Sequence, residues 1–451
     1  MHARSVFSFV LCLAFLSSML PSAAQTAPPM PTLDPLVAAA VADVSTERLR
    51  AIDTKLVSFG TRSTFSEKSA PGRGVFAARS WIAAQFREIA KASHGRMTVA
   101  YDSYLKKADG RRMPRDVEIS SVIATLKGDG SDSRTYVMSS HYDSRNTDNN
   151  DGVHDAPGAD DNGSGTSAVL EAARAMAALP VHATVIFATF DAEEQGLYGS
   201  QHFARTLKAD DVDVEGDLNN DIVGTSIGDK GQRNPHTVRI FSEALASGAT
   251  PGGINAIGNE NDSPSRELAR YAKETSDRYV PDFSGNLIFR ADRFLRGGDH
   301  ESFNAEGFAA LRFTEPVETF AHQHQNVRME NGVQYGDLLQ FMDFEYLKHV
   351  TQYNIASLAS LALGPGRPAT ASVITKDLTN DTTLAWSAVS RAVSYEVVRR
   401  ATTDATWTSS ENVGNVTTVT VPYSKDNWLF GIRAVDAQGH RGVVAFPLPV
   451  R

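Results

Sequence analysis

The chain has 451 residues, with 53 acidic and 44 basic side chains and a formal net charge of −9 at pH 7. This length allows two or three domains, and the absence of a basic patch interleaved with aromatic residues argues against nucleic acid as a partner. The single cysteine, Cys12, leaves the rest of the chain without disulfides, thiolate metal sites or a cysteine nucleophile.

Residues 1–24 have the pattern of a secretory signal peptide. Arg4 gives a basic start, residues 6–20 form an apolar run, and Ser22 to Ala24 are small residues suited to cleavage near Ala24. The run is short for a membrane span, and no second apolar run reaches that length, so no membrane association is expected. An exported chain without disulfides is typical of a secreted or periplasmic bacterial protein.

Strands and helices alternate through residues 25–362. A largely helical pattern runs from residue 36 to 93, followed by β-rich segments at 117–128 and 134–143. A helix is then expected over 165–179, an apolar strand over 182–190 and a helix over 196–209. This alternation predicts a three-layer α/β/α domain with a mixed, mostly parallel sheet, in which ligands gather at the carboxyl ends of the strands.

Residues 363–451 form a second predicted domain, a small all-β sandwich. Glycine and proline interrupt the pattern at 361–372, and short β-like runs follow with turns at about ten-residue spacing. Trp386 and Tyr395 in these runs resemble positions of a fibronectin type III domain. Polysaccharide and protein are both partners that such a domain could contact, and the Gly-Pro-Gly linker predicts few contacts with the first domain.

His141 and Asp143 lie at the end of a predicted buried strand. Two residues apart, they point to the same face of the strand. A metal-bound histidine commonly donates its second ring N–H to a carboxylate, which Asp143 could supply, or Asp143 could itself be a ligand. A simple His–Asp hydrogen bond at a strand end would give the same pattern.

Two further pairs of carboxylates also occur at element ends. Asp160 and Asp161 precede the glycines that open a helix, where one aspartate could simply be a cap. Glu193 and Glu194 follow the apolar strand, where they could form a solvated acidic turn. In a metallohydrolase, one of two adjacent carboxylates binds metal while the other acts as general base toward water.

Asp221, His322 and His324 complete the candidate set. Oxygen and imidazole ligands without thiolates suit zinc, manganese or cobalt. A carboxylate that is shared by two metal ions is the usual arrangement of two-metal hydrolases.

The ordered motifs "HYDS", "PGADDNGSG", "DAEEQGLYGS", "NNDIVG", "GGDHESF" and "FAHQHQN" resemble those of the two-zinc aminopeptidases, whose relatives include glutamate carboxypeptidases and glutaminyl cyclases. The resemblance covers roughly residues 50–362. It implies a secreted exopeptidase that acts on peptide substrates with two Zn²⁺ ions per chain. The implied ligands are His141, Asp160 and Asp221 for one ion, and Asp160, Glu194 and His322 for the other. Glu193 would be the general base and Asp143 the partner of His141, and the peptide bond between Asp160 and Asp161 would be cis.

The last histidine ligand departs from the family pattern, and the role of His300 is left open between two alternatives. The last histidine usually stands four residues before an aspartate, but His322 is followed there by Asn326 and His324 by Arg328. Because asparagine keeps the hydrogen-bonding capacity, we prefer His322 over His324. His300 matches a position near the site and is expected to contact substrate or a ligand.

An aminopeptidase is the leading interpretation of the sequence. A glutaminyl cyclase of the same fold is one alternative, although that chemistry needs only one zinc ion. A catalytically inactive metal-bearing binding protein is the other, and the spare carboxylate of Glu193 argues against it.

Overall fold

The computed structural model describes residues 32–68, 71–243 and 258–451. The expected signal peptide, residues 1–24, lies outside the described residues. Within these ranges, no helix combines the length and the apolar character needed to cross a membrane.

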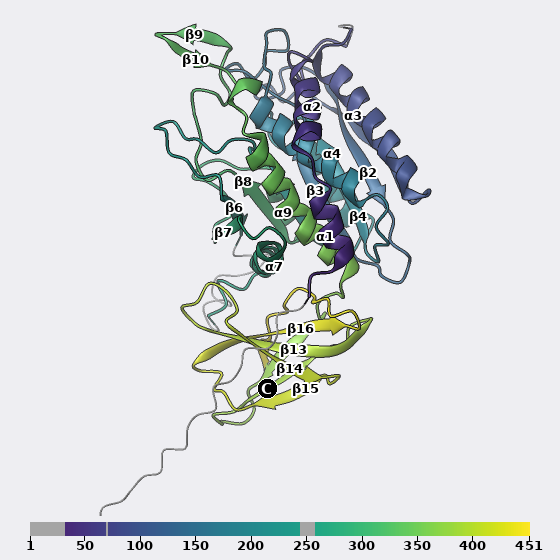
Figure 1. Ribbon diagram of the computed structural model, residues 1–451, viewed down its shortest axis with the longest axis vertical. Helices are drawn as coiled ribbons and strands as arrows, with labels where there is room; N and C mark the ends of the chain where they lie inside the picture. The colour runs from purple at the N-terminus through teal and green to yellow at the C-terminus, as the bar shows by residue number, and fades with distance from the viewer. Residues whose placement is uncertain (1–31, 69–70, 244–257) are drawn as a thin grey trace, which may run out of the picture. The chain divides into compact units, whose positions relative to one another are not determined.

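An eight-stranded mixed sheet forms the centre of the fold, in the order β1-β2-β4-β3-β5-β8-β6-β7 (Figure 1). Parallel neighbours are β3/β4, β3/β5, β5/β8 and β6/β7, and antiparallel neighbours are β1/β2, β2/β4 and β6/β8. This confirms the predicted mixed α/β fold. The strands are β1 (Met97–Lys106), β2 (Val117–Leu126), β3 (Thr135–His141), β4 (Thr184–Phe190), β5 (Val214–Asn220), β6 (Thr237–Ser242), β7 (Ser284–Ile288) and β8 (Ala310–Thr314).

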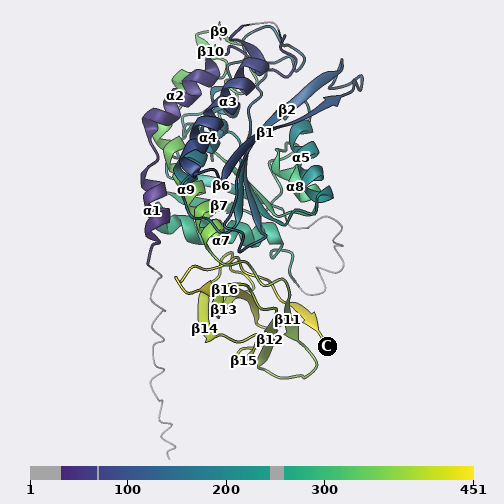
Figure 2. The same cartoon turned by 90° about the vertical axis from the view of Figure 1, so that its right-hand side faces the viewer.

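Helices cover both faces of the sheet. In Figure 2, α5 and α8 lie on one side of it, and α1, α2, α3, α4 and α9 lie on the other. An apolar cluster fills each space, with Phe203 and Phe303 on the α5/α8 side and a larger cluster around α4 and α9. The helices are α1 (Pro35–Ala42), α2 (Thr46–Val57), α3 (Gly74–Ala90), α4 (Gly165–Met176), α5 (Tyr198–Ala209), α7 (Pro264–Tyr279), α8 (His300–Ala305) and α9 (Phe344–Leu363).

Several short elements connect these layers. A hairpin of β9 (Arg328–Glu330) and β10 (Val333–Tyr335) lies between β8 and α9. Single turns occur at η1 (Lys91–Ser93), η2 (Ala159–Ser164) and η3 (Leu339–Phe341). The η2 turn carries the paired aspartates and leads directly into α4.

Strand β3 lies at the point where the strand order reverses. After β3 the chain passes through α4 to β4 on one side, and then through α5 to β5 on the other. In open α/β sheets the crevice at such a reversal, beyond the carboxyl ends of the strands, is where ligands bind. His141 is the last residue of β3, Glu193 and Glu194 follow β4, and Asp221 follows β5.

The C-terminal region consists of two small sheets that share one apolar core. One sheet has the order β15-β12-β11-β17 and the other β14-β13-β16. Trp386 and Tyr395 meet in the core between them, with ring centroids 5.5 Å apart. Helix α9 ends at Leu363 and β11 begins at Ala371. The strands are β11 (Ala371–Ile374), β12 (Thr382–Trp386), β13 (Ala392–Ala401), β14 (Ser409–Gly414), β15 (Thr418–Val421), β16 (Trp428–Asp436) and β17 (Leu448–Val450).

The C-terminal sheets contact the α/β domain more closely than the glycine-rich linker predicts. Arg400 of β13 is buried and forms an ion pair with Asp262, which precedes α7, at 2.6 Å. The indole N–H of Trp407 donates to Glu267 of α7 at 2.9 Å. The expectation of few contacts is therefore wrong. Arg270 of α7 already pairs with the buried carboxylates of Asp262 and Glu267, and the sandwich adds a second cation and an indole N–H to them.

Candidate metal centre

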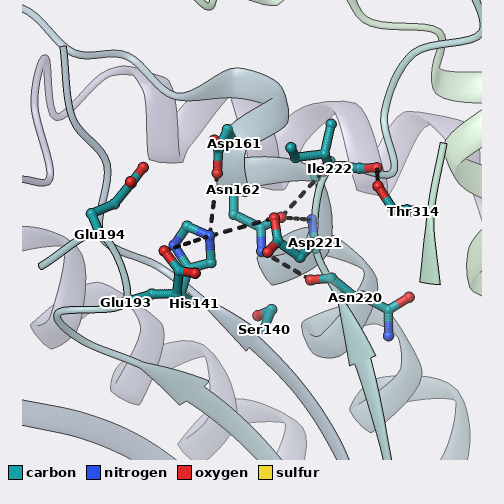
Figure 3. Close-up of polar contacts among 12 residues, drawn as sticks. Ser140, His141, Asp161, Asn162, Glu193, Glu194, Asn220, Asp221, Ile222 and Thr314 are labelled. Carbon is teal, nitrogen blue, oxygen red and sulfur yellow. Dashed lines mark hydrogen bonds and ion pairs between the residues drawn. The ribbon is translucent and has the colours of Figure 1, made fainter. Parts of the chain in front are cut away.

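His141 is held at the end of β3 with one ring nitrogen toward Asp143 and the other toward three carboxylates. Its Nδ1 atom lies 3.4 Å from an Asp143 carboxylate oxygen and 3.1 Å from the Asp143 carbonyl oxygen. Its Nε2 atom lies 3.2 Å from Asp161, 3.6 Å from Asp221 and 4.0 Å from Glu193 (Figure 3). Burial lowers the pKa of His141, but these carboxylates, led by Glu193, outweigh it and hold the pKa well above its usual value.

Asp143 is fully buried and also fixes the turn after β4. Its two carboxylate oxygens accept the backbone N–H groups of Glu193 and Glu194, each at 3.2 Å. One side chain thus positions both His141 and the two glutamates. The structure places Asp143 behind the histidine, as the sequence predicts for a partner rather than a ligand.

Asp161 stands between two histidines. One of its carboxylate oxygens is 3.2 Å from His141 Nε2, and the other is 2.8 Å from His324 Nε2. Burial alone would raise the pKa of Asp161, but the two imidazoles outweigh it and hold the pKa well below its usual value. Asp161 therefore occupies the shared position that the family resemblance assigns to Asp160.

Asp160 points away from the histidines, which corrects the sequence-based assignment. Its carboxyl accepts the backbone N–H of Gly224 at 2.7 Å and forms a hydrogen-bonded carboxyl pair with Glu315. Burial and the nearby Asp337 raise the pKa of Asp160 well above its usual value. The two aspartates are adjacent in sequence, but the backbone turns between them and directs their side chains to different sides. The cis peptide bond shows the same one-residue difference, since it joins Asp161 to Asn162.

Glu194 and Glu193 diverge in the way that the sequence predicts. Glu194 lies 3.1 Å from His324 Nε2 and is buried. Glu193 lies on the His141 side and lines the open pocket with its side chain 13% exposed. Burial raises the pKa of both glutamates.

His324, rather than His322, reaches the carboxylates. Burial lowers the pKa of His324, but Glu194 and Asp161 raise it to about 10. The ring of His322 instead stacks on Phe341 with centroids 3.7 Å apart, and burial lowers its pKa. The preference for His322 is therefore corrected. The sequence offered only the spacing to Asn326, and the structure uses Asn326 to accept the backbone N–H of Thr147 at 3.2 Å instead.

Asp221 faces His141 with one oxygen and a buried arginine with the other. Its second oxygen is 3.0 Å from Arg312 of β8, a fully buried side chain that also pairs with Asp292 at 2.7 Å. Sequence reasoning missed Arg312. Its signal was a lone charged residue within the otherwise apolar strand "ALRFT".

Two further residues that the sequence did not single out hold the η2 turn in place. The Asp337 carboxylate accepts the backbone N–H of Asp160 at 2.9 Å and that of Asp161 at 2.7 Å. The buried guanidinium of Arg62 donates to the carbonyl oxygens of Tyr142 and Gly158, at 2.6 and 2.8 Å. These bonds tie the turn to the end of β3 and so fix Asp161 against His141.

His300 does not line the pocket. It is fully buried at the start of α8, where its Nε2 atom is 2.8 Å from the Ala291 carbonyl oxygen and 3.8 Å from Asp292. The His300 ring is therefore not positioned to contact a substrate in the pocket, contrary to the expectation from the sequence. It lies behind the Arg312–Asp292 pair instead.

Two groups of metal-binding side chains thus meet across Asp161. His141, Glu193 and Asp221 form one group of potential ligands, and Asp161, Glu194 and His324 form the other. The sheet edge, the imidazole and carboxylate donors and an adjoining pocket of about 300 Å³ define a metallohydrolase centre.

The chain belongs to peptidase family M28. The model of that family matches residues 121–343, a range that contains all six candidate ligands. A probable zinc metalloprotease of Leptosphaeria maculans is 46% identical to this chain, over 92% of this chain and 97% of the relative. A probable zinc metalloprotease of Pyricularia oryzae is 44% identical, over 91% of this chain and 84% of the relative. The family predicted from the motifs is confirmed, while the bacterial source gains no support from these fungal relatives.

Solved structures share the fold at lower identity. The LapA aminopeptidase of Legionella pneumophila is 20% identical with a TM-score of 0.53, covering 72% of this chain and 74% of that one. A glutaminyl cyclase of Macrostomum lignano is 13% identical with a TM-score of 0.52, covering 73% and 93%. At this identity the likeness shows the fold alone, and both chemistries occur on it.

Proposed function

We propose that the protein is a zinc aminopeptidase with two metal positions that share Asp161. His141 and Asp221 would complete one position, and Glu194 and His324 the other. The arrangement of Asp161 between two imidazoles carries this proposal, because one carboxylate that faces two histidines is what a bridging ligand requires. The relatives named as zinc metalloproteases support the choice of metal.

The side chains present fit zinc. Four ligand atoms placed tetrahedrally about 2.0–2.1 Å from a zinc ion lie roughly 3.3 Å apart. The contacts of His141 and His324 with the surrounding carboxylates span 2.8 to 4.0 Å. His141 Nε2 and Glu194 Oε1 are buried without a hydrogen-bond partner in the described part of the chain, as expected of atoms that bind a cation. No thiolate is available, and none is needed.

The protein side chains then divide the catalytic work. When bound, the zinc ions would polarise the scissile carbonyl and make water a stronger acid. Glu193, which reaches the pocket and makes no hydrogen bond to either histidine, takes the proton from the attacking water and passes it to the leaving amine. Asp143 keeps the His141 ring oriented and holds the backbone of Glu193 in place.

The pocket favours cleavage at the end of a chain. Its volume of about 300 Å³ is at the small end of the range for ligand sites. Glu301 lines the pocket. Among the described residues, no cationic side chain lies within ion-pair distance of its carboxylate. Its carboxylate is therefore available to an α-ammonium group. The aminopeptidases that share the fold are consistent with this polarity.

Blocked and unblocked reporters test the proposal. Zinc-loaded protein should release the leaving group from aminoacyl reporters with a free α-amine and should not act on their N-acetylated forms. Chelation should abolish turnover, and added zinc should restore it. Cleavage of the acetylated forms would contradict an aminopeptidase, and formation of pyroglutamate from an N-terminal glutamine peptide would favour a cyclase instead.

Export is proposed on separate grounds. Residues 1–24 have the composition of a cleavable signal, and the sole cysteine falls within it. We expect the mature protein to begin near Gln25. Mass spectrometry of the protein secreted by an expression host would show an unprocessed N-terminus if this is wrong.

A further inference from the structure

Arginine side chains gather at the rim of the active-site pocket. Its lining includes the guanidinium groups of Arg112, Arg145, Arg293, Arg296 and Arg312. They come from different parts of the chain: the β1–β2 connection, the segment after β3, the β7–α8 connection and β8. The candidate ligands lie after β3, β4 and β5, in the η2 turn and in the segment that follows β8. Basic and acidic side chains thus share one cavity.

Two of these arginines have carboxylate partners that account for their charge. Arg312 pairs with Asp221 and Asp292, at 3.0 and 2.7 Å. Arg293 pairs with Asp292 at 3.2 Å and with Glu318 at 3.1 Å. Both serve to hold the wall of the pocket.

Arg296 is left with an excess of positive charge around it. Among the described residues its only ion pair is with Glu318, at 3.0 Å, and the same carboxylate already receives Arg239 at 2.7 Å and Arg293 at 3.1 Å. Three guanidinium groups thus converge on one carboxylate. Arg296 lines the pocket and its side chain is 31% exposed, so donors remain for a further anion.

Arg112 and Arg145 have no carboxylate within ion-pair distance in the described part of the chain. Arg112 reaches only the Glu194 carbonyl oxygen, at 3.5 Å, and Arg145 donates to the carbonyl oxygens of Asn146 and Thr147, at 3.1 and 3.3 Å. A guanidinium presents five donors in a planar fork that matches a carboxylate. These two side chains and Arg296 therefore face the cavity with donors that the protein itself does not satisfy.

We infer that the pocket selects substrates that carry a carboxylate close to the scissile bond, recognised by Arg296 together with Arg112 and Arg145. This inference rests on the proposed peptidase function and names its substrate class. The carboxylate can be an acidic side chain of the terminal residue or the free α-carboxylate of a short peptide. Glu301 at the same wall complements it, because a substrate of this class brings an ammonium group as well as a carboxylate.

Binding of three matched small ligands separates the two sources. Glutamic acid α-amide carries only the side-chain carboxylate, glutamine carries only the α-carboxylate, and glutaminamide carries neither. Calorimetric titration into zinc-loaded protein should show at least one of the first two binding about 10-fold or more tightly than glutaminamide. Whichever ligand gains identifies the carboxylate that is read. Equal binding of all three would overturn the inference.

The variant Arg296→Gln ties the preference to the arginine. The ratio of kcat/KM for a glutamyl reporter to that for a leucyl reporter should fall about 10-fold or more, mainly through KM for the glutamyl reporter. Arg205→Gln is the matched control, because Arg205 on α5 is 67% exposed, lies outside the pocket and pairs weakly with Glu306 at 3.5 Å. An unchanged ratio in Arg296→Gln, or the same fall in Arg205→Gln, would contradict the inference.

The outcomes also distinguish this inference from the proposed function. If no reporter is cleaved but the carboxylate ligands bind more tightly, the aminopeptidase proposal fails and the pocket assignment stands. If reporters are cleaved while a leucyl reporter is preferred and the three ligands bind alike, the function stands and the inference fails.

Discussion

Adjacent carboxylates at this site have different environments, and burial separates their roles. Asp161 lies between His141 and His324, which favour its charged form. Asp160 lies against Glu315, and the pKa values of both are raised by burial in a carboxyl pair. A cation would therefore find a charge at one position and a shared proton at the other.

Exchanging each aspartate for asparagine tests this difference. Asp161→Asn should lose both zinc ions, because it removes the charge that faces both histidines. Asp160→Asn should keep its zinc, since the amide oxygen can still accept the Gly224 N–H. Elemental analysis of the two purified variants gives the answer. The reverse result would restore the assignment made from the sequence.

The sequence predicted the types of residue at the site better than their register. His141, Asp143, Glu193, Glu194 and Asp221 lie at strand ends, where hydrophobic strands and their first polar residues mark the position clearly. The choice between Asp160 and Asp161, or between His322 and His324, depends on the direction of side chains in an irregular turn. No periodicity constrains that direction, so neighbouring candidates could not be separated.

At the scale of elements, the centre depends on how the η2 turn is held against β3. Asp337 accepts two backbone N–H groups of the turn. Arg62 donates to one carbonyl oxygen just after β3 and to another just before the turn. Arg62 is fully buried, so if its side chain were removed, water could not replace it as the donor to these carbonyl groups. The position of Asp161 is thus set by residues that make no contact with the pocket.

Arg62→Leu should therefore weaken both the fold and the metal site. We expect a loss of at least about 3 kcal/mol in the free energy of unfolding, because several buried carbonyl groups become unsatisfied. Urea unfolding measures it, with Arg205→Leu as an exposed control. Wild-type stability together with full zinc content would show that the turn holds its shape without this side chain.

The order of strands could be anticipated only in part. Alternating strand and helix patterns predicted the α/β class and the strand ends that carry ligands. The reversal of strand order at β3 and the antiparallel edges depend on long-range pairing, which local sequence does not encode. Arg62 and Asp337 were missed for the same reason, since each acts across 80 or more residues of sequence.

At the scale of the whole molecule, the C-terminal sandwich contributes partners to buried carboxylates at the start of α7. Asp262 is buried and pairs with Arg400 at 2.6 Å, while Glu267 receives the Trp407 indole N–H. The Gly-Pro-Gly linker suggested independent domains. The composition of a linker, however, gives no information about ion pairs between the two regions that it joins. The sequence therefore did not predict this interface.

Arg400→Met should destabilise the protein by about 3–5 kcal/mol, because it leaves the Asp262 carboxylate buried without its main partner. Arg399→Met is the control on the same strand, since Arg399 stacks on Tyr423 and Trp428 within the sandwich. Chemical unfolding should show the larger loss for Arg400→Met. Equal losses for the two variants would mean that the interface contributes little, as the linker suggested.

His440 of the C-terminal region makes the stability of the fold depend on pH. It lies between Asp436 at 3.0 Å and Asp34 at 2.8 Å, and the hydrogen bond to Asp436, with the smaller one to Asp34, raises its pKa above the usual value. A raised histidine pKa stabilises the fold fully below the unfolded pKa of about 6.5, and this contribution is lost as the pH rises through the folded pKa. The Tm difference between wild type and His440→Gln should therefore be largest near pH 6 and shrink toward pH 9. A difference that grows with pH would contradict this.

Glu193→Gln distinguishes a general base from a metal ligand at the position beside Glu194. Glu193 lies close enough to His141 and Asp221 to be a ligand, whereas we propose that it is the general base. The measurement is zinc content and turnover of an aminoacyl reporter on the same preparation. We expect wild-type zinc content with turnover reduced about 10²–10⁴-fold, since glutamine keeps the size of the side chain and removes its basicity. Loss of zinc, or retention of more than about a tenth of the turnover, would contradict it.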